Sequence, residues 1–407
     1  MAGDNFSFLR DSLLKAFKLP WFAVLSILAR FAVRDRNLWL FSRRSGVGDG
    51  PLAMALHFRE INPALRLVWL TRDDADDRLA EFHQLEFHRR DSLHGLLLCL
   101  KAGGGFMTNG FSDLRGPAIW GAQVIQLWHG APLKRIGRDR RDHSGRQNVL
   151  LRRLIDRLEA YWNSHCTYVI SASPLAAERL CSAMALPASR VVVTGDPRMD
   201  LVGRDNGAAR RTLEALAVTH GLGGRRLFAI VAPTWREDGA VVDGLDAHAC
   251  SIVAARSDLV VFVRAHPHSA EIDAFDGVPN VIALSPLDYR DVTALLAGFD
   301  VLLTDYSSIA MDFSVLSRPI VLVAPDLLGY AAAPGLYEDY CRFSEGRSYG
   351  SWSDGIVELV SLCEGDHALA QSYSDRSRAM AARYHPFGTE GNAERVASLL
   401  ASGKECR

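Results

Sequence analysis

Polar side chains follow three apolar runs in the second half of the chain, at 229–233, 260–263 and 301–303. They share groups that donate hydrogen bonds to phosphate oxygens or orient such donors. The residues concerned are Thr234, Arg236, Arg264, His266, Asp305, Ser307 and Ser308. Three strand ends of matching chemistry predict a phosphate-binding site.

Ser307 and Ser308 precede the helical pattern IAMDFSVLS. Free backbone N–H groups and the positive end of the helix dipole make such a position suitable for a phosphate group. The same serines could instead be ordinary N-caps. Asp305 has two interpretations as well, since its carboxylate can contact the donor site or hold the turn.

The stretch VIQLWHGAPLKRIG at 124–137 ends an apolar run on His129 and Gly130. A histidine there can hydrogen-bond the backbone and do nothing more. However, a neutral imidazole with a pKa near its ordinary value is also suited to remove a hydroxyl proton at neutral pH. We expect His129 to be a catalytic base that faces the phosphate site from the first half of the chain.

A basic tract follows His129. Between positions 134 and 157 the chain has nine Lys or Arg residues and three Asp residues, although its formal net charge is −1. The tract is either a solvated helix face or a surface for a phosphate-rich acceptor or an anionic membrane. The candidate acceptor residues are Lys134, Arg135 and Arg138. The overall charge argues against a nucleic-acid binder.

Short β-type runs alternate with helical patterns from residue 37 onward, which predicts parallel sheets covered by helices on both faces. The runs lie at 37–42, 66–71, 106–108, 123–128, 167–171, 190–195, 226–233, 259–264, 280–284, 300–305 and 319–325. In such sheets, ligands bind beyond the carboxyl ends of the strands. The predicted fold is therefore α/β, with two doubly wound Rossmann-type domains facing each other across a cleft.

Apolar density falls once, at 203–226, and we expect the domain boundary there. This divides the chain into an N-terminal helical segment at 1–34, an acceptor-side domain at 35–205 and a donor-binding domain at 206–407. The N-terminal segment has apolar residues at helical spacing. It can lie in a membrane interface, pack on the protein's own core or pair with another subunit.

Composition supports a cytoplasmic protein without a structural metal. The chain is 48% hydrophobic and 23% charged, which suits two globular domains, and its cysteines are scattered without a Cys-x-x-Cys pair. No secretory signal is evident, and the charge-free run 19–29 is too short to span a bilayer. DDADD at 73–77 is more typical of an acidic helix start than of a metal site. SGVGDG at 45–50 is not a GxGxxG motif.

Several ordered motifs resemble the CDP-glycerol glycerophosphotransferase family, whose members prime and polymerise chains of the teichoic acid type. The motifs are QLWHGAPLKRIG (126–137), TGDPRMD (194–200), APTWRED (232–238), RAHPHS (264–269), LLTDYSSIAMDFSVLSRPIVLVAPD (302–326) and GTEGNAERVASLL (388–400). The resemblance begins near residue 35 and covers most of the chain.

The resemblance implies a GT-B-like fold and transfer of a polyol phosphate from CDP-glycerol or a related CDP-polyol, with release of CMP. The acceptor would be a hydroxyl of a lipid-linked or polysaccharide chain at the inner face of the cell membrane. His129 matches the family's proposed base, His266 a histidine that contacts the donor diphosphate, and Ser307 and Ser308 its phosphate-binding turn. The sequence has no evident magnesium site, so we expect no cofactor besides this substrate, and protein cations would neutralise the diphosphate.

Four positions depart from the family's usual residues, and none of them removes a candidate catalytic group. They are Ala131, Asp196, Met199 and Ala265, where the family usually has threonine, tyrosine, asparagine and proline. Two other functions stay open at this point. One is a glycosyltransferase or nucleotide-sugar epimerase of the same fold, which releases a nucleoside diphosphate. The other is a non-catalytic membrane- or polymer-binding protein that uses the basic tract.

Overall fold

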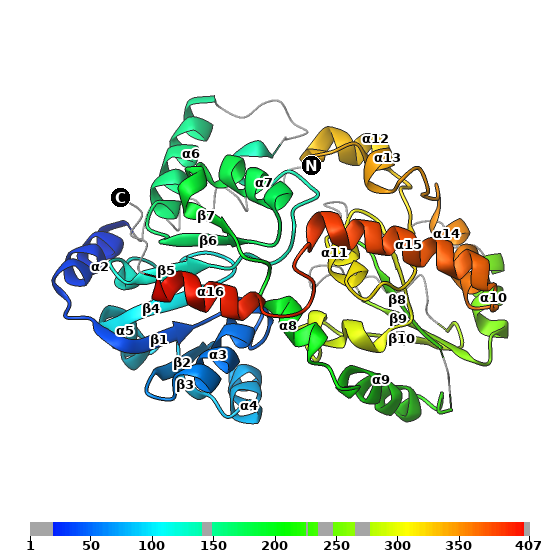
Figure 1. Ribbon diagram of the computed structural model, residues 1–407, viewed down its shortest axis with the longest axis horizontal. Coiled ribbons are helices and arrows are strands. Elements are labelled where there is room, and N and C mark those ends of the chain that lie inside the picture. The colour runs from blue at the N-terminus through cyan, green and yellow to red at the C-terminus, as the bar shows by residue number, and fades with distance from the viewer. Residues whose placement is uncertain (1–18, 141–148, 225–226, 235–246, 265–276, 403–407) are drawn as a thin grey trace.

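Two α/β lobes lie side by side in the computed structural model (Figure 1). The structure describes residues 19–140, 149–224, 227–234, 247–264 and 277–402. Each lobe is built on one parallel sheet, and the two sheets do not share strands. We call the part with the first sheet the N-lobe and the part with the second sheet the C-lobe.

The N-lobe sheet has the strand order β3-β2-β1-β4-β5-β6-β7, and every neighbouring pair is parallel. Its strands are β1 (Asp35–Phe41), β2 (Arg66–Thr71), β3 (Glu86–Arg89), β4 (Ala102–Met107), β5 (Gln123–Gln126), β6 (Tyr168–Ser171) and β7 (Val191–Val193). Its helices are α2 (Leu19–Phe31), α3 (Asp49–Ile61), α4 (Asp74–Phe82), α5 (Leu93–Lys101), α6 (Val149–Asn163) and α7 (Pro174–Met184). The order reverses between β1 and β4, which is where doubly wound sheets bind ligands.

The C-lobe sheet has the order β10-β9-β8-β11-β12, again all parallel. Its strands are β8 (Leu227–Ala232), β9 (Leu259–Val263), β10 (Val281–Ala283), β11 (Val301–Thr304) and β12 (Ile320–Leu322). The remaining helices are α8 (Arg198–Gly203), α9 (Ala208–Thr219), α10 (Ala247–Ala255), α11 (Ile309–Ser314), α12 (Leu327–Tyr330), α13 (Tyr340–Phe343), α14 (Trp352–Leu362), α15 (His367–Tyr384) and α16 (Asn392–Ala401). The reversal here lies between β8 and β11.

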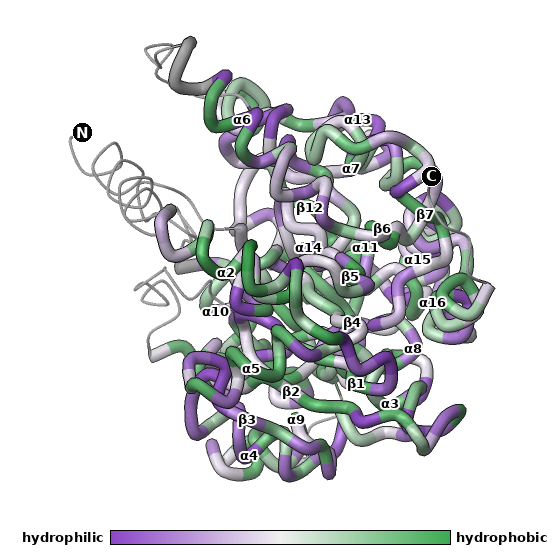
Figure 2. The backbone as a smooth tube through the Cα atoms, turned by 90° about the vertical axis from the view of Figure 1, so that its left-hand side faces the viewer, coloured by the Kyte–Doolittle hydropathy of each residue, from purple (hydrophilic) through white to green (hydrophobic). Residues whose placement is uncertain are grey.

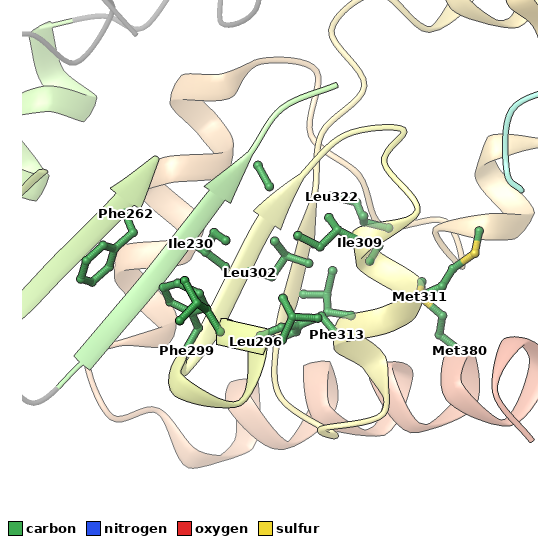
Figure 3. Close-up of a cluster of buried hydrophobic side chains, with 14 of the residues drawn as sticks. Ile230, Phe262, Leu296, Phe299, Leu302, Ile309, Met311, Phe313, Leu322 and Met380 are labelled. Carbon is green, nitrogen blue, oxygen red and sulfur yellow. The ribbon is translucent and has the colours of Figure 1, made fainter. Parts of the chain in front are cut away.

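Aliphatic and aromatic side chains from one face of the C-lobe sheet form a buried core. Ile230, Phe262 and Leu302 project from neighbouring strands toward Phe299 and Phe313 (Figure 3). All five side chains are completely or almost completely buried. The strands are apolar on both faces because helices cover both sides, and this produces the continuous apolar runs that predicted them.

Each strand expected from the sequence is present, although several end one or two residues earlier than expected. The sequence missed β3, whose residues Glu86–Arg89 read EFHR. This strand lies at the edge of the sheet and is only half buried, so it has no apolar run that could reveal it. The predicted GT-B-like architecture of two Rossmann-type domains is otherwise confirmed.

The last helix, α16, packs on the N-lobe, whereas the residues that precede it belong to the C-lobe. In Figure 1, the chain crosses from α15 on the C-lobe to α16, which lies on the N-lobe. Ala393 and Val396 join the N-lobe core, and the carboxylate of Asp200 accepts hydrogen bonds from the backbone N–H groups of Asn392 and Ala393. The sequence placed 206–407 in one domain, whereas packing places α16 with the N-lobe.

We predict that Gly195→Ala will weaken the packing of α16 on the N-lobe and lower the free energy of unfolding. Gly195 has a φ of 85°, and a Cβ atom there would overlap the side-chain amide of Asn392. The left-handed backbone costs about 1 kcal/mol for alanine, and the steric clash adds about 1–3 kcal/mol. Urea denaturation followed by tryptophan fluorescence measures the loss.

Gly365→Ala is the matched control. Gly365 has a φ of 89°, but a Cβ atom there would meet nothing within 4 Å. It therefore reports the backbone cost alone, and equal losses for the two variants would contradict the proposed contact with α16.

Candidate active site

His129 lies three residues beyond the end of β5, at the carboxyl edge of the N-lobe sheet. The adjacent Gly130 contacts the other lobe, since a Cβ atom placed on it would lie 3.1 Å from the Ser308 hydroxyl oxygen. Ser308 begins α11, directly after the turn that follows β11. The structure therefore brings together the predicted base segment and the predicted phosphate-binding turn, which are far apart in the sequence.

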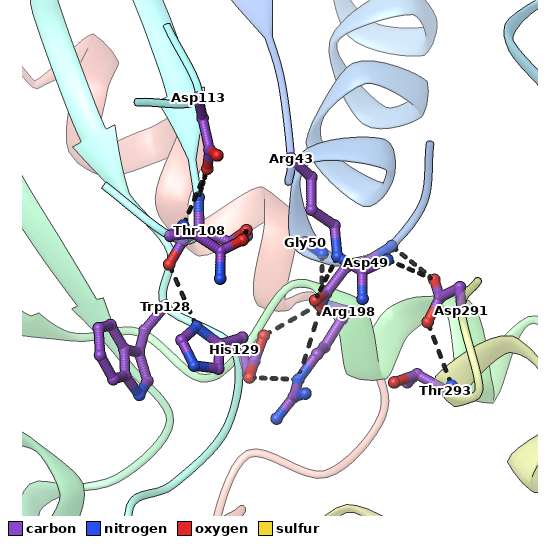
Figure 4. Close-up of polar contacts among 12 residues, drawn as sticks. Arg43, Asp49, Gly50, Thr108, Asp113, Trp128, His129, Arg198, Asp291 and Thr293 are labelled. Carbon is purple, nitrogen blue, oxygen red and sulfur yellow. Dashed lines mark hydrogen bonds and ion pairs between the residues drawn. The ribbon is translucent and has the colours of Figure 1, made fainter. Parts of the chain in front are cut away.

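The orientation of the His129 ring is set by two contacts. The Nδ1 nitrogen lies 3.2 Å from the carbonyl oxygen of Thr108, and the Trp128 ring stacks on the imidazole with centroids 4.3 Å apart (Figure 4). A carbonyl oxygen can only accept, so Nδ1 must carry the proton. In the neutral ring, Nε2 is then the nitrogen that can accept a proton.

The backbone around His129 adopts conformations that most residues avoid. Trp128 has a φ of 60° and Gly130 a φ of 131°. A bulky residue in the left-handed region is strained, and such strain persists where the surrounding structure over-determines it. The residue keeps contact with solvent, but the protein groups packed around the imidazole remove part of its hydration and lower the pKa of His129 below its ordinary value of 6.5. The neutral, proton-accepting form is therefore favoured near pH 7.

A buried arginine, Arg198, connects the two lobes directly behind Gly130. Its guanidinium lies 2.7 Å from the carboxylate of Asp196 in the same turn and 2.7 Å from that of Asp312 on α11 of the C-lobe. Burial opposes its charge, but Asp196, Asp312 and Asp49 outweigh burial and raise the pKa of Arg198. The charge at Asp196, unexplained by the sequence, is thus one of the partners of Arg198.

A second set of charges joins the start of α3 to the C-lobe. The backbone N–H of Asp49 donates to the carboxylate of Asp291 over 2.7 Å, and Arg43 lies 3.3 Å from Asp49 and 3.7 Å from Asp291 (Figure 4). Asp291 therefore caps the amino end of an N-lobe helix from the other lobe. Arg264, beyond β9, also interacts with Asp291 and Arg43, and burial lowers its pKa to about 10.

On the donor side, Asp305 has a clear structural contact. Its carboxylate accepts hydrogen bonds from the backbone N–H and the hydroxyl of Thr234, at 2.9 and 2.6 Å, and its carbonyl oxygen accepts one from Tyr340. The carboxylate is completely buried, so in this structure it holds the turns after β8 and β11 together. Of the two interpretations of Asp305, the geometry favours the structural one.

Ser307 and Ser308 lie half buried at the start of α11. The Ser307 hydroxyl accepts a weak hydrogen bond from the N–H of Ile309 at 3.4 Å, and among the described residues Ser308 makes no side-chain cap. Both hydroxyls therefore differ from ordinary strong N-caps. Contact of either serine with a phosphate stays a prediction.

The start of the basic tract contacts the C-lobe. The backbone N–H of Arg135 donates to the carbonyl of Gly335, its Nε donates to the carbonyl of Leu336, and Lys134 pairs with Leu336 in a backbone bridge. Lys134 and Arg138 have exposed side chains. Arg135 thus has a role in the lobe interface, and contact of the three residues with an acceptor stays a prediction.

Two predicted donor residues, Arg236 and His266, lie outside the described residues. Within the described ranges, no group of three or more His, Cys, Asp or Glu side chains could hold a metal ion. The acidic stretch 73–77 starts α4 as expected, because the Asp73 carboxylate accepts from the N–H groups of Ala75 and Asp76. Asp73 and Asp76 also pair with Arg290 of the C-lobe.

The sequence missed the residues that hold the two lobes together. Asp49 lies in the glycine-rich stretch that was set aside because it is no dinucleotide motif. Arg198 and Asp312 lie inside motifs noted for their resemblance, but nothing local shows that they pair. A charged residue within an otherwise apolar helix start, such as Asp312 in IAMDFSVLS, was the available signal.

Comparison with known proteins identifies the family. The model of the family CDP-Glycerol:Poly(glycerophosphate) glycerophosphotransferase matches residues 23–402. The chain belongs to this CDP-glycerol glycerophosphotransferase family. The resemblance seen in the motifs is confirmed.

Relatives in the family include teichoic acid enzymes. The chain is 30% identical over 270 residues to the teichoic acid poly(glycerol phosphate) polymerase of Staphylococcus epidermidis, covering 64% of this chain and 36% of the relative. It is 25% identical to the polymerase of Bacillus subtilis, covering 79% and 43%, and 25% identical to the teichoic acid glycerol-phosphate transferase of Staphylococcus aureus, covering 75% and 79%. The chain thus spans less than half of each of the two polymerases.

Solved structures show the same fold. The wall teichoic acid polymerase TagF matches with a TM-score of 0.73 and 20% identity, over 97% of each chain. A UDP-GlcNAc 2-epimerase from Neisseria meningitidis matches with a TM-score of 0.52 and 12% identity, over 90% of this chain and 99% of that one. At these identities the matches establish the fold and not the reaction.

We predict that Arg198→Met will lower the free energy of unfolding of this glycerophosphotransferase-family chain by about 3–5 kcal/mol, because it leaves buried carboxylates without their cation. Urea denaturation measures the change. Arg204→Met is the control, since Arg204 pairs with Glu60 while both side chains are more than half exposed. The control should cost less than about 1 kcal/mol. A similar small loss for Arg198→Met would contradict the structural role of the buried cluster.

Proposed function

We propose that this chain transfers glycerol phosphate from CDP-glycerol to an acceptor hydroxyl and releases CMP. Family membership supports the donor and the reaction class. Two observations support the proposal: Gly130, next to His129, lies against Ser308 of the other lobe, and the contact of Nδ1 with the Thr108 carbonyl leaves Nε2 of His129 as the proton acceptor. In this proposal the C-lobe binds the donor and the N-lobe presents the base to the acceptor.

The proposed step balances in charge and atoms. The acceptor oxygen forms a bond to the β-phosphorus, which bears the glycerol, and the bond from that phosphorus to the bridging oxygen breaks. CMP leaves with the electron pair, and the acceptor proton passes to Nε2 of His129. General base catalysis of this kind contributes about 10²–10⁴ in rate.

Negative charge grows on the departing CMP phosphate during this step. Arg264, the backbone N–H groups near Ser307 and Ser308, and His266 and Arg236 are the proposed donors that stabilise it. Arg264 is well suited because it is half buried yet still charged, with a pKa of about 10. A fixed charge with few water contacts stabilises a developing anion more than an exposed one.

The proposal predicts that purified protein will release CMP from CDP-glycerol when a hydroxyl acceptor is present. His129→Ala should lower kcat by about 10²–10⁴ because the proton acceptor is lost. His220→Ala is the control, since His220 is an exposed histidine at the end of α9. Released nucleotide is measured by chromatography with a panel of CDP-polyols and nucleotide sugars.

Release of UDP or another nucleoside diphosphate would instead support the glycosyltransferase or epimerase alternative. Full activity of His129→Ala would contradict the assignment of the base. The panel also decides between glycerol and another polyol, and product mass shows how many units are added.

We also propose that the chain acts at the cytoplasmic face of a membrane, on a lipid-linked or polysaccharide acceptor. α2 buries Leu25 and Ala29 but exposes other apolar side chains. Figure 2 colours much of α2 as hydrophobic. The exposed residues are Trp21, Val24, Ile27, Leu28 and Phe31. An amphipathic helix with an exposed apolar face is suited to lie in a membrane interface. None of the helices in the described ranges combines the length and hydropathy of a membrane span.

The neighbouring helix α6 extends this surface. Phe22 of α2 packs edge-on against Trp162 of α6, with ring centroids 5.3 Å apart. α6 exposes Leu154 and Leu158 together with Arg153 and Arg157. Apolar side chains among arginines suit an anionic lipid surface, because burial and charge attraction then act together.

We predict that the double change Ile27→Asp and Phe31→Asp will weaken binding to phosphatidylglycerol-containing vesicles at least about tenfold, since two apolar contacts are lost. Vesicle co-sedimentation measures the bound fraction. Leu287→Asp with Leu328→Asp is the control, because both leucines are exposed on the C-lobe. Equal binding by both double variants would contradict the proposed surface.

A further inference from the structure

The carbonyl group that accepts from His129 belongs to a peptide unit held from its other side. Thr108 and Asn109 follow β4, and the Thr108 carbonyl shares a planar peptide with the Asn109 N–H. That N–H donates to the carboxylate of Asp113 over 2.8 Å, and the N–H of Thr108 donates to the same oxygen over 3.1 Å. Because the peptide is rigid, holding the Asn109 N–H also fixes the direction of the Thr108 carbonyl.

Asp113 is itself fixed on every side. It is completely buried, and its second oxygen accepts from Arg72 over 3.1 Å. Arg72 in turn donates to the backbone carbonyl of Arg43. Burial raises the pKa of Asp113, and the two N–H groups and Arg72 oppose that shift. All three donors approach it as an acceptor, which is the arrangement that an ionised carboxylate requires.

Figure 4 shows Asp113, Thr108 and His129 in sequence, connected by dashed lines. Resting on the proposed role of His129 as base, we propose that Asp113 is a positioning residue for His129 that acts through the Thr108–Asn109 peptide. It keeps the proton on Nδ1 and leaves Nε2 ready to accept. Its negative charge also polarises the peptide, which makes the Thr108 carbonyl a stronger acceptor for Nδ1–H.

A purely structural role would look different. If Asp113 only stabilised the loop 108–113, its loss would lower the free energy of unfolding without changing which ring nitrogen of His129 is protonated. The tautomer of His129 therefore separates the two roles. It can be read from the ¹⁵N shifts of histidine-labelled protein and does not depend on any activity assay.

The test compares wild type with Asp113→Asn, which keeps the size of the side chain but removes its charge and sets an amide N–H against Arg72 or the backbone donors. We expect the Nδ1–H tautomer of His129 in wild type and a measurable Nε2–H population in the variant. With CDP-glycerol as donor, kcat should fall about tenfold while KM for the donor stays unchanged.

Asp300→Asn is the matched control. Asp300 also accepts hydrogen bonds from a backbone N–H, that of Phe228, and from an arginine, Arg210. It lies just before β11, at the amino edge of the C-lobe sheet and therefore away from His129. It should leave the His129 tautomer and kcat as in wild type. A folded Asp113→Asn variant with an unchanged His129 tautomer would overturn the inference, whatever its kcat.

If Asp113→Asn fails to fold, the wild-type spectrum and Arg72→Gln, which removes the partner of Asp113, decide the question. An Nε2–H tautomer in wild type, or an Arg72→Gln spectrum identical to wild type, would overturn the inference. The assignment of His129 as the base is tested separately, and full activity of His129→Ala would contradict it. A loss of activity in His129→Ala with no tautomer change in Asp113→Asn would keep the base and remove the role of Asp113.

Discussion

The buried ion pair between Arg198 and Asp312 is the contact on which the arrangement of this site depends. Arg198 begins α8, which follows the last N-lobe strand, and Asp312 belongs to α11 in the C-lobe. Both side chains are almost completely buried. A small separation of the lobes would therefore break the ion pair without giving either charge full hydration. A buried charge without its partner costs several kcal/mol, which makes one relative position of the lobes strongly preferred.

Other contacts lie around this ion pair. His385, near the path of the chain back to the N-lobe, lies 3.2 Å from Asp312. Asp291 caps α3 from the other lobe, and Gly130 has no side chain because Arg198 and Ser308 occupy the space where one would be. The loop that carries His129 and the turn that carries the serines are thereby brought to the same place. The lobes form the site jointly, and neither sheet provides it alone.

The sequence predicted what depends on local pattern. Apolar runs fall where helices cover both faces of a sheet, so the strands and the two Rossmann-type sheets could be read from it, and the polar strand ends indicated His129, Arg264 and the serines. β3 was missed because an edge strand needs no apolar run. The docking of α16 was missed because its contact with Asp200 joins residues 192 positions apart.

The same limit explains the missed site residues. Arg198 and Asp312 are 114 positions apart, and no local spacing shows that their charges meet. The role of Asp113 depends on the orientation of one peptide plane, which follows from the turn after β4 and not from residue type. Pairing across lobes and backbone orientation are properties of the fold, whereas candidate chemistry at strand ends is visible in the residues themselves.

A crystal structure of the protein soaked with CDP-glycerol tests the central claim most directly. The account predicts that the diphosphate will lie between the His129 ring and the Ser307–Ser308 turn, with the Arg198–Asp312 pair intact behind Gly130. A diphosphate bound away from both His129 and the serine turn would contradict it.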